Sequence, residues 1–210
     1  MRRNGNGPVI AIDIDGTIAP FHEHFLKFAE GWYGREMPSA DDYMGDMPLC
    51  KFMGSSKATY RKCKLAYRQG GLKRSMPIYP EAPRMIAHLR KLGAEVWICT
   101  TRPYLSLDNI EPDTRHWLKR HKVQHDGVIF GEHKYRDLVH QVGSNRIVAI
   151  LDDLPEMLDQ AISLNLDSLI RGQSYNKGYG GNAAGYAVDL DSALIMLENR
   201  LRNWRDRNAS

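Results

Sequence analysis

Short apolar segments without polar alternation recur along the chain, and each gives way to polar or small residues. They cover residues 9–12, 95–99, 127–130 and 146–151, with a weaker fifth segment at residues 167–170. Runs of this length, rich in Val and Ile, are typical of strands buried on both faces of a parallel sheet. The pattern therefore predicts a parallel sheet at the centre of the protein.

Segments with apolar residues at helical spacing alternate with these strands. We expect helices over residues 80–92, 112–121 and 155–164, with Gly93 ending the first and Pro112 suited to the first turn of the second. Strand–helix alternation predicts an α/β fold, a Rossmann-like three-layer sandwich with a mostly parallel sheet and helices on both faces.

Residues 21–77 interrupt this alternation. They are rich in Met, Tyr and Lys, and we expect them to form a small helical cap inserted after the first strand. The core then comprises residues 1–20 and 78–189. Residues 190–210 carry an apolar stripe typical of an amphipathic helix, which packs on the core or, in the alternative, on the partner of a homodimer.

Two smaller expectations concern segments beside the core. Residues 171–186 are rich in Gly, Asn and Tyr, which predicts a loop. His22 and His24 follow the first strand closely, and we expect them to face solvent rather than to bind a metal.

Composition fits a globular chain of this length. Of the 210 residues, 42% are hydrophobic and 26% are charged, which argues against disorder. No apolar run approaches the roughly 20 residues that a membrane span needs. The three cysteines form neither a zinc pattern nor a disulfide framework, so we expect a cytoplasmic protein without a membrane partner.

Positive charge is concentrated in the predicted cap. The net charge is +4, and the stretch from Lys51 to Arg74 contains eight basic residues and no acidic one. Such a stretch attracts anionic ligands or forms a solvated helix face, and the sequence leaves both interpretations open.

Polar side chains follow three of the predicted strands. They are Asp13, Asp15, Thr100, Arg102, Asp152 and Asp153. Because ligands bind beyond the carboxyl ends of parallel strands, we expect these side chains to gather at one edge of the sheet. One carboxylate of a pair can attack phosphorus while the other exchanges protons with the leaving oxygen and with water.

A phosphate dianion needs positive charge to approach such a cluster. Mg²⁺ suits a site built from oxygen ligands, and Asp152 would complete it with Asp13 while Asp153 holds a metal-bound water. The donors expected to bind the phosphate are Thr100, the amide of Thr101, Lys134 and Arg102.

This arrangement resembles the haloacid dehalogenase-like hydrolase superfamily. The match consists of Asp-Ile-Asp-Gly-Thr at residues 13–17, a strand ending in Thr100, a following lysine best matched by Lys134, and an apolar strand ending in Asp152 and Asp153. The four motifs occur in order over roughly residues 9–170.

The resemblance implies a role for each matching residue. Asp13 is the implied nucleophile and a metal ligand, and Asp15 is the implied acid and base, with its backbone carbonyl on Mg²⁺. Thr100 and Lys134 bind the phosphate, although Lys119 and Lys122 remain alternatives to Lys134.

The remaining implied roles belong to the acidic pair. Asp152 is implied to bind the metal with support from Asp153, and either of them can be the primary ligand.

The substrate is predicted from the cap and two strand ends. Residues 100–103 and 151–153 resemble the deoxyribonucleotidase branch and the phosphatase domain of polynucleotide kinase, and the basic cap is rich in aromatic residues. We expect a 5′-nucleotidase acting on (deoxy)nucleoside monophosphates. The alternatives are a phosphatase acting on the 3′ ends of nucleic acids and a catalytically silent nucleotide- or nucleic-acid-binding module.

Overall fold

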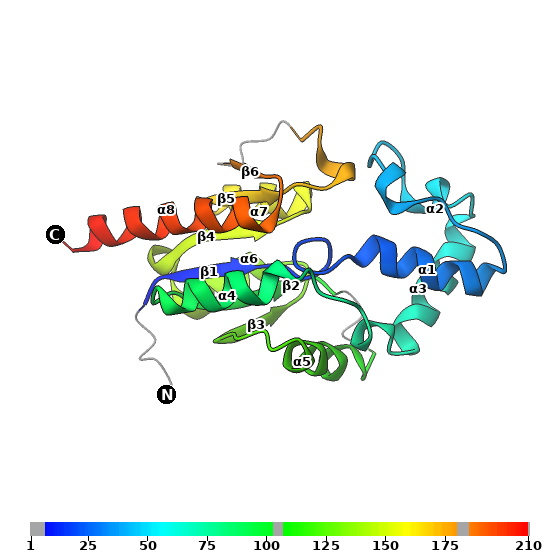
Figure 1. Cartoon of the computed structure of the whole chain (residues 1–210), viewed down its shortest axis with the longest axis horizontal. Coiled ribbons are helices and arrows are strands. Elements are labelled where there is room, and N and C mark those ends of the chain that lie inside the picture. Colours follow the sequence, from blue (N-terminus) through cyan, green and yellow to red (C-terminus); the bar gives the residue numbers. More distant parts are fainter. Residues whose placement is uncertain (1–6, 103–106, 180–184, 210) are drawn as a thin grey trace.

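Six parallel strands form one sheet in the computed structural model, which describes residues 7–102, 107–179 and 185–209 (Figure 1). In spatial order the strands are β3 (Gly127–Phe130), β2 (Glu95–Thr100), β1 (Val9–Ile12), β4 (Ile147–Asp152), β5 (Ser168–Arg171) and β6 (Gly185–Ala187). Neighbouring strands pair in parallel throughout the sheet. The predicted α/β Rossmann-like fold is confirmed.

Helices cover both faces of this sheet. The helices that pack on one face are α4 (Glu81–Lys91), α5 (Ile110–Arg120) and α8 (Leu190–Asn208), and those on the other are α6 (Lys134–Val142) and α7 (Pro155–Ser163). Strands β1 and β4 are buried along their whole length, which explains why their sequences show no polar alternation. The sandwich thus has three layers.

Local sequence accounts for the ends of the helices that carry the core. Helix α4 buries Ala82, Met85, Ile86 and Leu89, which recur every three to four residues on one face. Gly93 follows with a φ of +92°, a conformation that glycine adopts without a steric penalty. Pro155 opens α7, where its missing N–H has no helical partner to lose.

The segment of residues 21–77 is largely helical and lies at the carboxyl ends of the strands (Figure 1). It contains α1 (Phe21–Tyr33), α2 (Leu49–Phe52), α3 (Lys57–Gln69) and the 3₁₀ turns η1 (Ala40–Asp42) and η2 (Leu72–Arg74). Most of its apolar residues pack into a cluster around Phe25, Met53, Cys63 and Tyr67, whereas Met76 packs in the core of the sandwich. We call this unit the cap.

Two segments differ from the sequence-based expectation. The predicted loop at 171–186 contains a 3₁₀ turn, η4 (Ser174–Asn176), and the edge strand β6, which is too short to leave a periodic pattern. Residues 180–184 lie outside the described residues. Lys134, expected in the loop after Phe130, is instead the first residue of α6.

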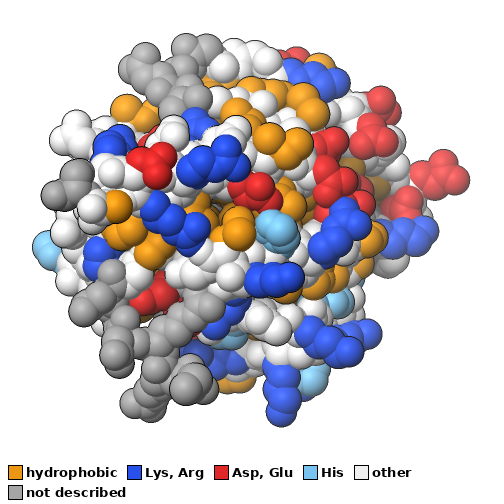
Figure 2. Space-filling view, turned by 60° about the vertical axis from the view of Figure 1, so that its left-hand side comes forward, with side chains coloured by type: hydrophobic (Ala, Val, Ile, Leu, Met, Phe, Trp, Pro, Cys, Tyr) orange, Lys and Arg blue, Asp and Glu red, His pale blue; other side chains and the backbone are white. Residues whose placement is uncertain are grey.

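The apolar stripe of α8 packs on its own chain. Leu190, Leu197 and Leu201 are buried in the core, and the Trp204 indole donates a hydrogen bond to the Asn145 carbonyl at 2.9 Å. Among the described residues, no helix combines the length and the apolar character that a bilayer span requires. On the face shown in Figure 2, basic and acidic side chains lie intermixed with apolar ones.

Candidate active site

Three buried carboxylates meet where β1 and β4 end. Asp13 follows β1 directly, Asp152 is the last residue of β4, and Asp153 comes next. One oxygen from each lies within 4.8 Å of the others. The parallel pairing of β1 with β4 creates this proximity, and the Asp13 amide donates a hydrogen bond to the Leu151 carbonyl at 3.0 Å. Each of the three acids is at most 3% exposed, so water screens their repulsion poorly.

Lys134 lies against two of these acids. Its ammonium donates hydrogen bonds of 2.6 Å to Asp13 Oδ1 and 2.6 Å to Asp152 Oδ2, and its side chain is fully buried. The Tyr135 hydroxyl donates a further hydrogen bond to Asp152. Because Lys134 and Tyr135 open α6, the turn after β3 sets the position of the cation relative to the acids.

Burial controls the protonation of the acid cluster. It raises the pKa of Asp13 to about 7, although the charge of Lys134 opposes the shift. It also raises the pKa of Asp153 well above its ordinary value, and the charges of Asp152 and Asp13 add to the effect. Burial disfavours the charge on Lys134, but both acids outweigh it and raise the pKa of Lys134. A cation added to this cluster would favour the ionised carboxylates.

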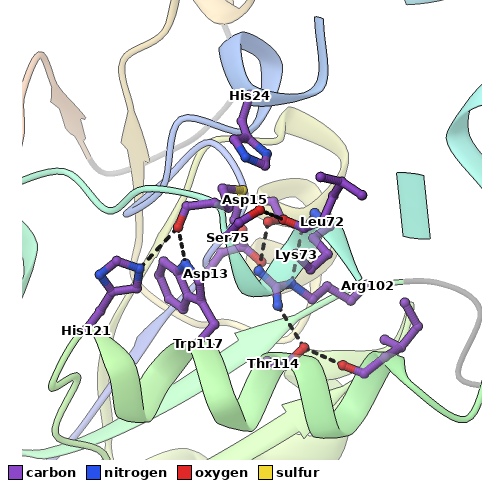
Figure 3. A network of polar contacts seen from close by, with 12 residues as sticks. Asp13, Asp15, His24, Leu72, Lys73, Ser75, Arg102, Thr114, Trp117 and His121 are labelled. Atoms are coloured by element: carbon purple, nitrogen blue, oxygen red, sulfur yellow. Dashed lines mark hydrogen bonds and ion pairs between the residues drawn. The ribbon is translucent and has the colours of Figure 1, made fainter. Parts of the chain in front are cut away.

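Asp15 points to a different set of partners (Figure 3). Its carboxylate accepts a 2.5 Å hydrogen bond from Lys73 of the cap and two hydrogen bonds, of 3.1 and 3.3 Å, from the Arg102 guanidinium. Arg102 in turn donates a 2.7 Å hydrogen bond to Thr114 on α5. Burial would raise the pKa of Asp15, but Arg102 and Lys73 together hold it well below its usual range.

A short segment after β5 holds Asp153 and the cap together. The Tyr175 hydroxyl donates a hydrogen bond to Asp153 Oδ2 at 2.5 Å, and the Thr17 hydroxyl donates to the other oxygen at 2.8 Å. The neighbouring Ser174 hydroxyl donates to the Tyr43 carbonyl in the cap at 2.8 Å. Gly16 lies beside Tyr175 with a φ of +94°, and a Cβ there would lie 2.2 Å from the Asp153 carboxylate.

A cavity of about 240 Å³ opens between the cap and the strand ends. Polar groups occupy its core side, where Asp13, Asp15 and Asp153 line it with Thr101 and Arg102. Apolar and cationic side chains from the cap and neighbouring segments complete the wall; they are Phe21, His22, Leu49, Tyr60, Lys64, Arg68, Lys73, Ile110 and Leu154. The cavity can therefore hold an organic group beside the carboxylates.

The structure brings the predicted site residues to this region in two layers. Thr101, Arg102, Asp13, Asp15 and Asp153 line the cavity. The remaining predicted residues are buried behind this lining; they are Thr100 and Asp152, which end β2 and β4, and Lys134, which begins α6. Pro103, which completes the turn after β2 in the sequence, lies outside the described residues. Lys119 and Lys122 are exposed and lie outside the cavity lining.

One expectation about this region is wrong, and several contacts were missed. His22 does not simply face solvent: it lines the cavity, its ring lies 4.6 Å from that of Tyr175, and burial lowers its pKa to about 4. Lys73 and Tyr175 were not predicted as site residues, because only tertiary packing brings the cap and the segment after β5 to the acids. Thr17 belongs to the first motif, which could have indicated it.

Comparison with known proteins gives one relative by sequence and several by structure. No protein-family model matches the chain. Putative nucleotidase OB0422 from Oceanobacillus iheyensis is 30% identical over 126 residues, which cover 60% of this chain and 62% of that protein. The aligned segment is therefore less than two thirds of either chain.

Solved structures match over nearly the full length. A haloacid dehalogenase-like hydrolase family protein, SP0104 from Streptococcus pneumoniae, aligns with a TM-score of 0.64 at 15% identity, covering 90% of this chain and 98% of that one. CbbY from Rhodobacter sphaeroides, in complex with phosphate, aligns with a TM-score of 0.59 at 15% identity, covering 87% and 94%. At such low identity these matches establish a shared fold.

Proposed function

Since the chain has the haloacid dehalogenase-like fold, we propose that it is a Mg²⁺-dependent phosphomonoesterase that uses Asp13 as its nucleophile and acts on nucleotides. The observation that carries the proposal is the cluster of Asp13, Asp152 and Asp153, the first two bound by Lys134, beside a cavity of molecular size. A purely structural role would not need three buried carboxylates so close together, because their repulsion costs stability.

The donor set fits a small hard cation. Three carboxylates that converge within 4.8 Å offer only oxygen ligands, which Mg²⁺ prefers, and no thiolate or imidazole joins them among the described residues. Asp13, Asp152 and Asp153 would hold the ion, with the Asp15 carbonyl as the further ligand that the family resemblance implies. When bound, Mg²⁺ would neutralise charge on the phosphate and orient it toward the nucleophile.

The protein groups then divide the reaction into two displacements. In the first, a carboxylate oxygen of Asp13 bonds to phosphorus while the bond from phosphorus to the leaving oxygen breaks, and Asp15 gives that oxygen a proton. In the second, water attacks phosphorus, Asp15 takes the proton, and inorganic phosphate leaves with the Asp13 carboxylate restored. Lys134 and the Thr101 amide would stabilise the phosphoryl oxygens.

Asp15 needs a change of partners before it can act as an acid. Lys73 and Arg102 stabilise its ionised form, and an ionised carboxylate has no proton to give. An incoming phosphate dianion offers these cations another partner, which would raise the pKa of Asp15 toward its ordinary range. Substrate binding would thus prepare the acid.

Two observations support nucleotides as the substrates. The curated relative is named a nucleotidase, and the cavity wall combines the aromatic side chains of Phe21 and Tyr60 with cations. Aromatic rings can stack on a base while cations hold phosphates. Deoxynucleoside 5′-monophosphates are our first choice.

Phosphate release tests the proposal. The purified protein is incubated with dGMP, dUMP, p-nitrophenyl phosphate and a 3′-phosphorylated oligonucleotide, each with Mg²⁺ and with EDTA. We expect Mg²⁺-dependent release, fastest from a mononucleotide. A strong preference for the oligonucleotide would indicate a 3′-end phosphatase, and binding of nucleotides without any release would indicate a binding module.

Replacing Asp15 should produce a loss of activity that depends on the leaving group. For Asp15→Asn we expect nucleotide hydrolysis to fall by about 10²–10⁴-fold, the usual contribution of a general acid. First-step phosphoryl transfer from p-nitrophenyl phosphate should fall much less, because nitrophenolate leaves without a proton; a nitrophenolate burst followed by slow turnover would show this. If the first phosphoryl transfer slowed by the same factor for the nucleotide and for p-nitrophenyl phosphate, Asp15 would not be the general acid.

A paired glycine substitution tests the close contact between the first motif and Asp153. Gly16→Ala should displace Asp153 and lower both Mg²⁺ affinity and phosphate release, because the new Cβ meets its carboxylate. Gly34→Ala is the matched control: its φ is +64°, but the Cβ meets nothing within 4 Å, so only about 1–2 kcal/mol of backbone strain should follow. Calorimetric titration measures the Mg²⁺ affinity of each variant. Equal Mg²⁺ affinities in Gly16→Ala and Gly34→Ala would contradict the expected displacement of Asp153.

A further inference from the structure

One cation of the cavity has a charge that the protein does not balance. Lys64 extends from α3 into the cavity wall, and across residues 7–102, 107–179 and 185–209 its ammonium makes no ion pair or hydrogen bond. Its recorded contacts are with aromatic rings, at 5.4 Å from the ring centre of Tyr60 and 6.0 Å from that of Phe21. The exposed neighbour Lys62 points to solvent instead.

Asp15, the acid whose charge acts on Lys64, cannot balance it. The Phe21 ring also contacts the ammonium of Lys73, which lies 4.1 Å from the ring centre and forms its ion pair with Asp15. Asp15 is already shared between Lys73 and Arg102. The cavity wall therefore carries more positive charge near Phe21 than its own carboxylate can neutralise.

An unpaired cation in such a place is costly for the free protein. Burial lowers the pKa of Lys64 to about 8, helped by the charge of Arg68, so the side chain stays mostly protonated at neutral pH. The contacts with the aromatic rings offset part of the free energy that the ammonium loses with its hydration. A carboxylate or phosphate partner would offset more of it. A ligand that brings an anion to this wall would gain that interaction.

From this arrangement we propose that Lys64 binds a second anionic group, carried on the leaving group of the substrate. The inference rests on the proposed phosphomonoesterase activity and goes beyond it: phosphomonoesters with an additional phosphate or carboxylate should bind more tightly than nucleoside monophosphates, whose leaving group carries no second anion. Phe21, Tyr60 and Leu49 would cover the organic part between the two anions. Among nucleotides, this chemistry describes a nucleoside bisphosphate better than a monophosphate.

Equilibrium binding tests the inference without turnover. In the Asp13→Asn background with Mg²⁺, calorimetry gives Kd values for two matched pairs: thymidine 5′-monophosphate against thymidine 3′,5′-bisphosphate, and phenyl phosphate against 4-carboxyphenyl phosphate. We expect the doubly anionic member of at least one pair to bind about tenfold more tightly, and the pair that shows it identifies phosphate or carboxylate as the group bound.

Substitution then assigns the preference to Lys64. Lys64→Met should abolish it, Lys64→Arg should retain it, and the exposed control Lys62→Met should leave it unchanged. If Lys64→Met does not fold, Lys64→Gln takes its place. Equal binding within both pairs, or a preference that survives the loss of Lys64, would overturn the inference alone. Binding of none of the four ligands would overturn the proposed function and this inference together.

Discussion

Asp13→Asn should abolish phosphate release and yet leave a more stable protein in EDTA. The amide cannot attack phosphorus, so we expect turnover to fall by about 10⁴-fold or more, to the detection limit. The fold should tolerate the change because Asp13 is one of three buried acids that repel one another, and Lys134 keeps its contact with Asp152. Loss of activity would therefore not arise from unfolding.

The stability gain has a defined pH dependence. The pKa of Asp13 is about 7 in the folded protein and near 3.8 when exposed, so the folded state binds the proton more tightly. The wild-type protein should accordingly lose stability as the pH rises from about 4 to 7, a loss that the asparagine variant avoids. The advantage of the variant should be small at pH 4 and reach about 4 kcal/mol at pH 8, the size that a pKa rise from 3.8 to about 7 implies.

Urea unfolding of the wild type and of Asp13→Asn at pH 4 and pH 8, with EDTA present, measures this difference in stability. An asparagine variant that is less stable than the wild type at pH 8 would show that the Asp13 carboxylate stabilises the fold, contrary to the account. Phosphate release within tenfold of the wild type would exclude Asp13 as the nucleophile.

Lys134→Met should lower both activity and stability. Methionine preserves much of the volume but leaves Asp13 and Asp152 buried without the cation between them. Breaking a buried ion pair in this way typically costs about 3–5 kcal/mol, and we expect a loss of this size in EDTA. Loss of one preorganised donor to the phosphoryl group should reduce kcat by about 10²–10³-fold.

Added Mg²⁺ should restore part of the stability but not the activity. A divalent cation can replace the charge of Lys134 near the two acids, whereas it cannot replace the donor to the phosphoryl oxygen. Thermal unfolding with and without Mg²⁺ measures the first effect, and phosphate release the second. Lys119→Met is the control, since Lys119 is exposed on α5, and a comparable loss in that variant would show that the effect is not local.

Local sequence was sufficient to predict the sheet and the acids at its edge. Buried strands such as β1 and β4 can be predicted from their continuous apolar residues. A parallel sheet brings the carboxyl ends of such strands to one edge, independently of the structure of the connecting segments. Asp13, Asp152 and Asp153 could therefore be grouped before any coordinates were known. Lys134 was also selected, although the helix that begins with it was not.

Contacts that depend on the cap could not be predicted in the same way. Nothing in the sequence distinguishes Lys73 or Lys64 from the exposed Lys57 and Lys62, because all belong to one basic stretch. The structure divides that stretch between two settings: Lys57 and Lys62 are solvated, and Lys64 and Lys73 line the cavity, where attraction of an anionic ligand stays a prediction. Tyr175 could not be predicted as a site residue, because it lies in a Gly- and Asn-rich segment without a periodic pattern of apolar residues.

The position of a covalent adduct would identify the nucleophile. Crystals grown with Mg²⁺ and beryllofluoride, which mimics a phosphoryl group on a carboxylate, would show the atom to which it bonds. We expect beryllium bonded to a carboxylate oxygen of Asp13, with Asp152 and Asp153 beside the metal. Beryllium bonded to any other side chain, or the three acids lying apart around the bound ion, would contradict it.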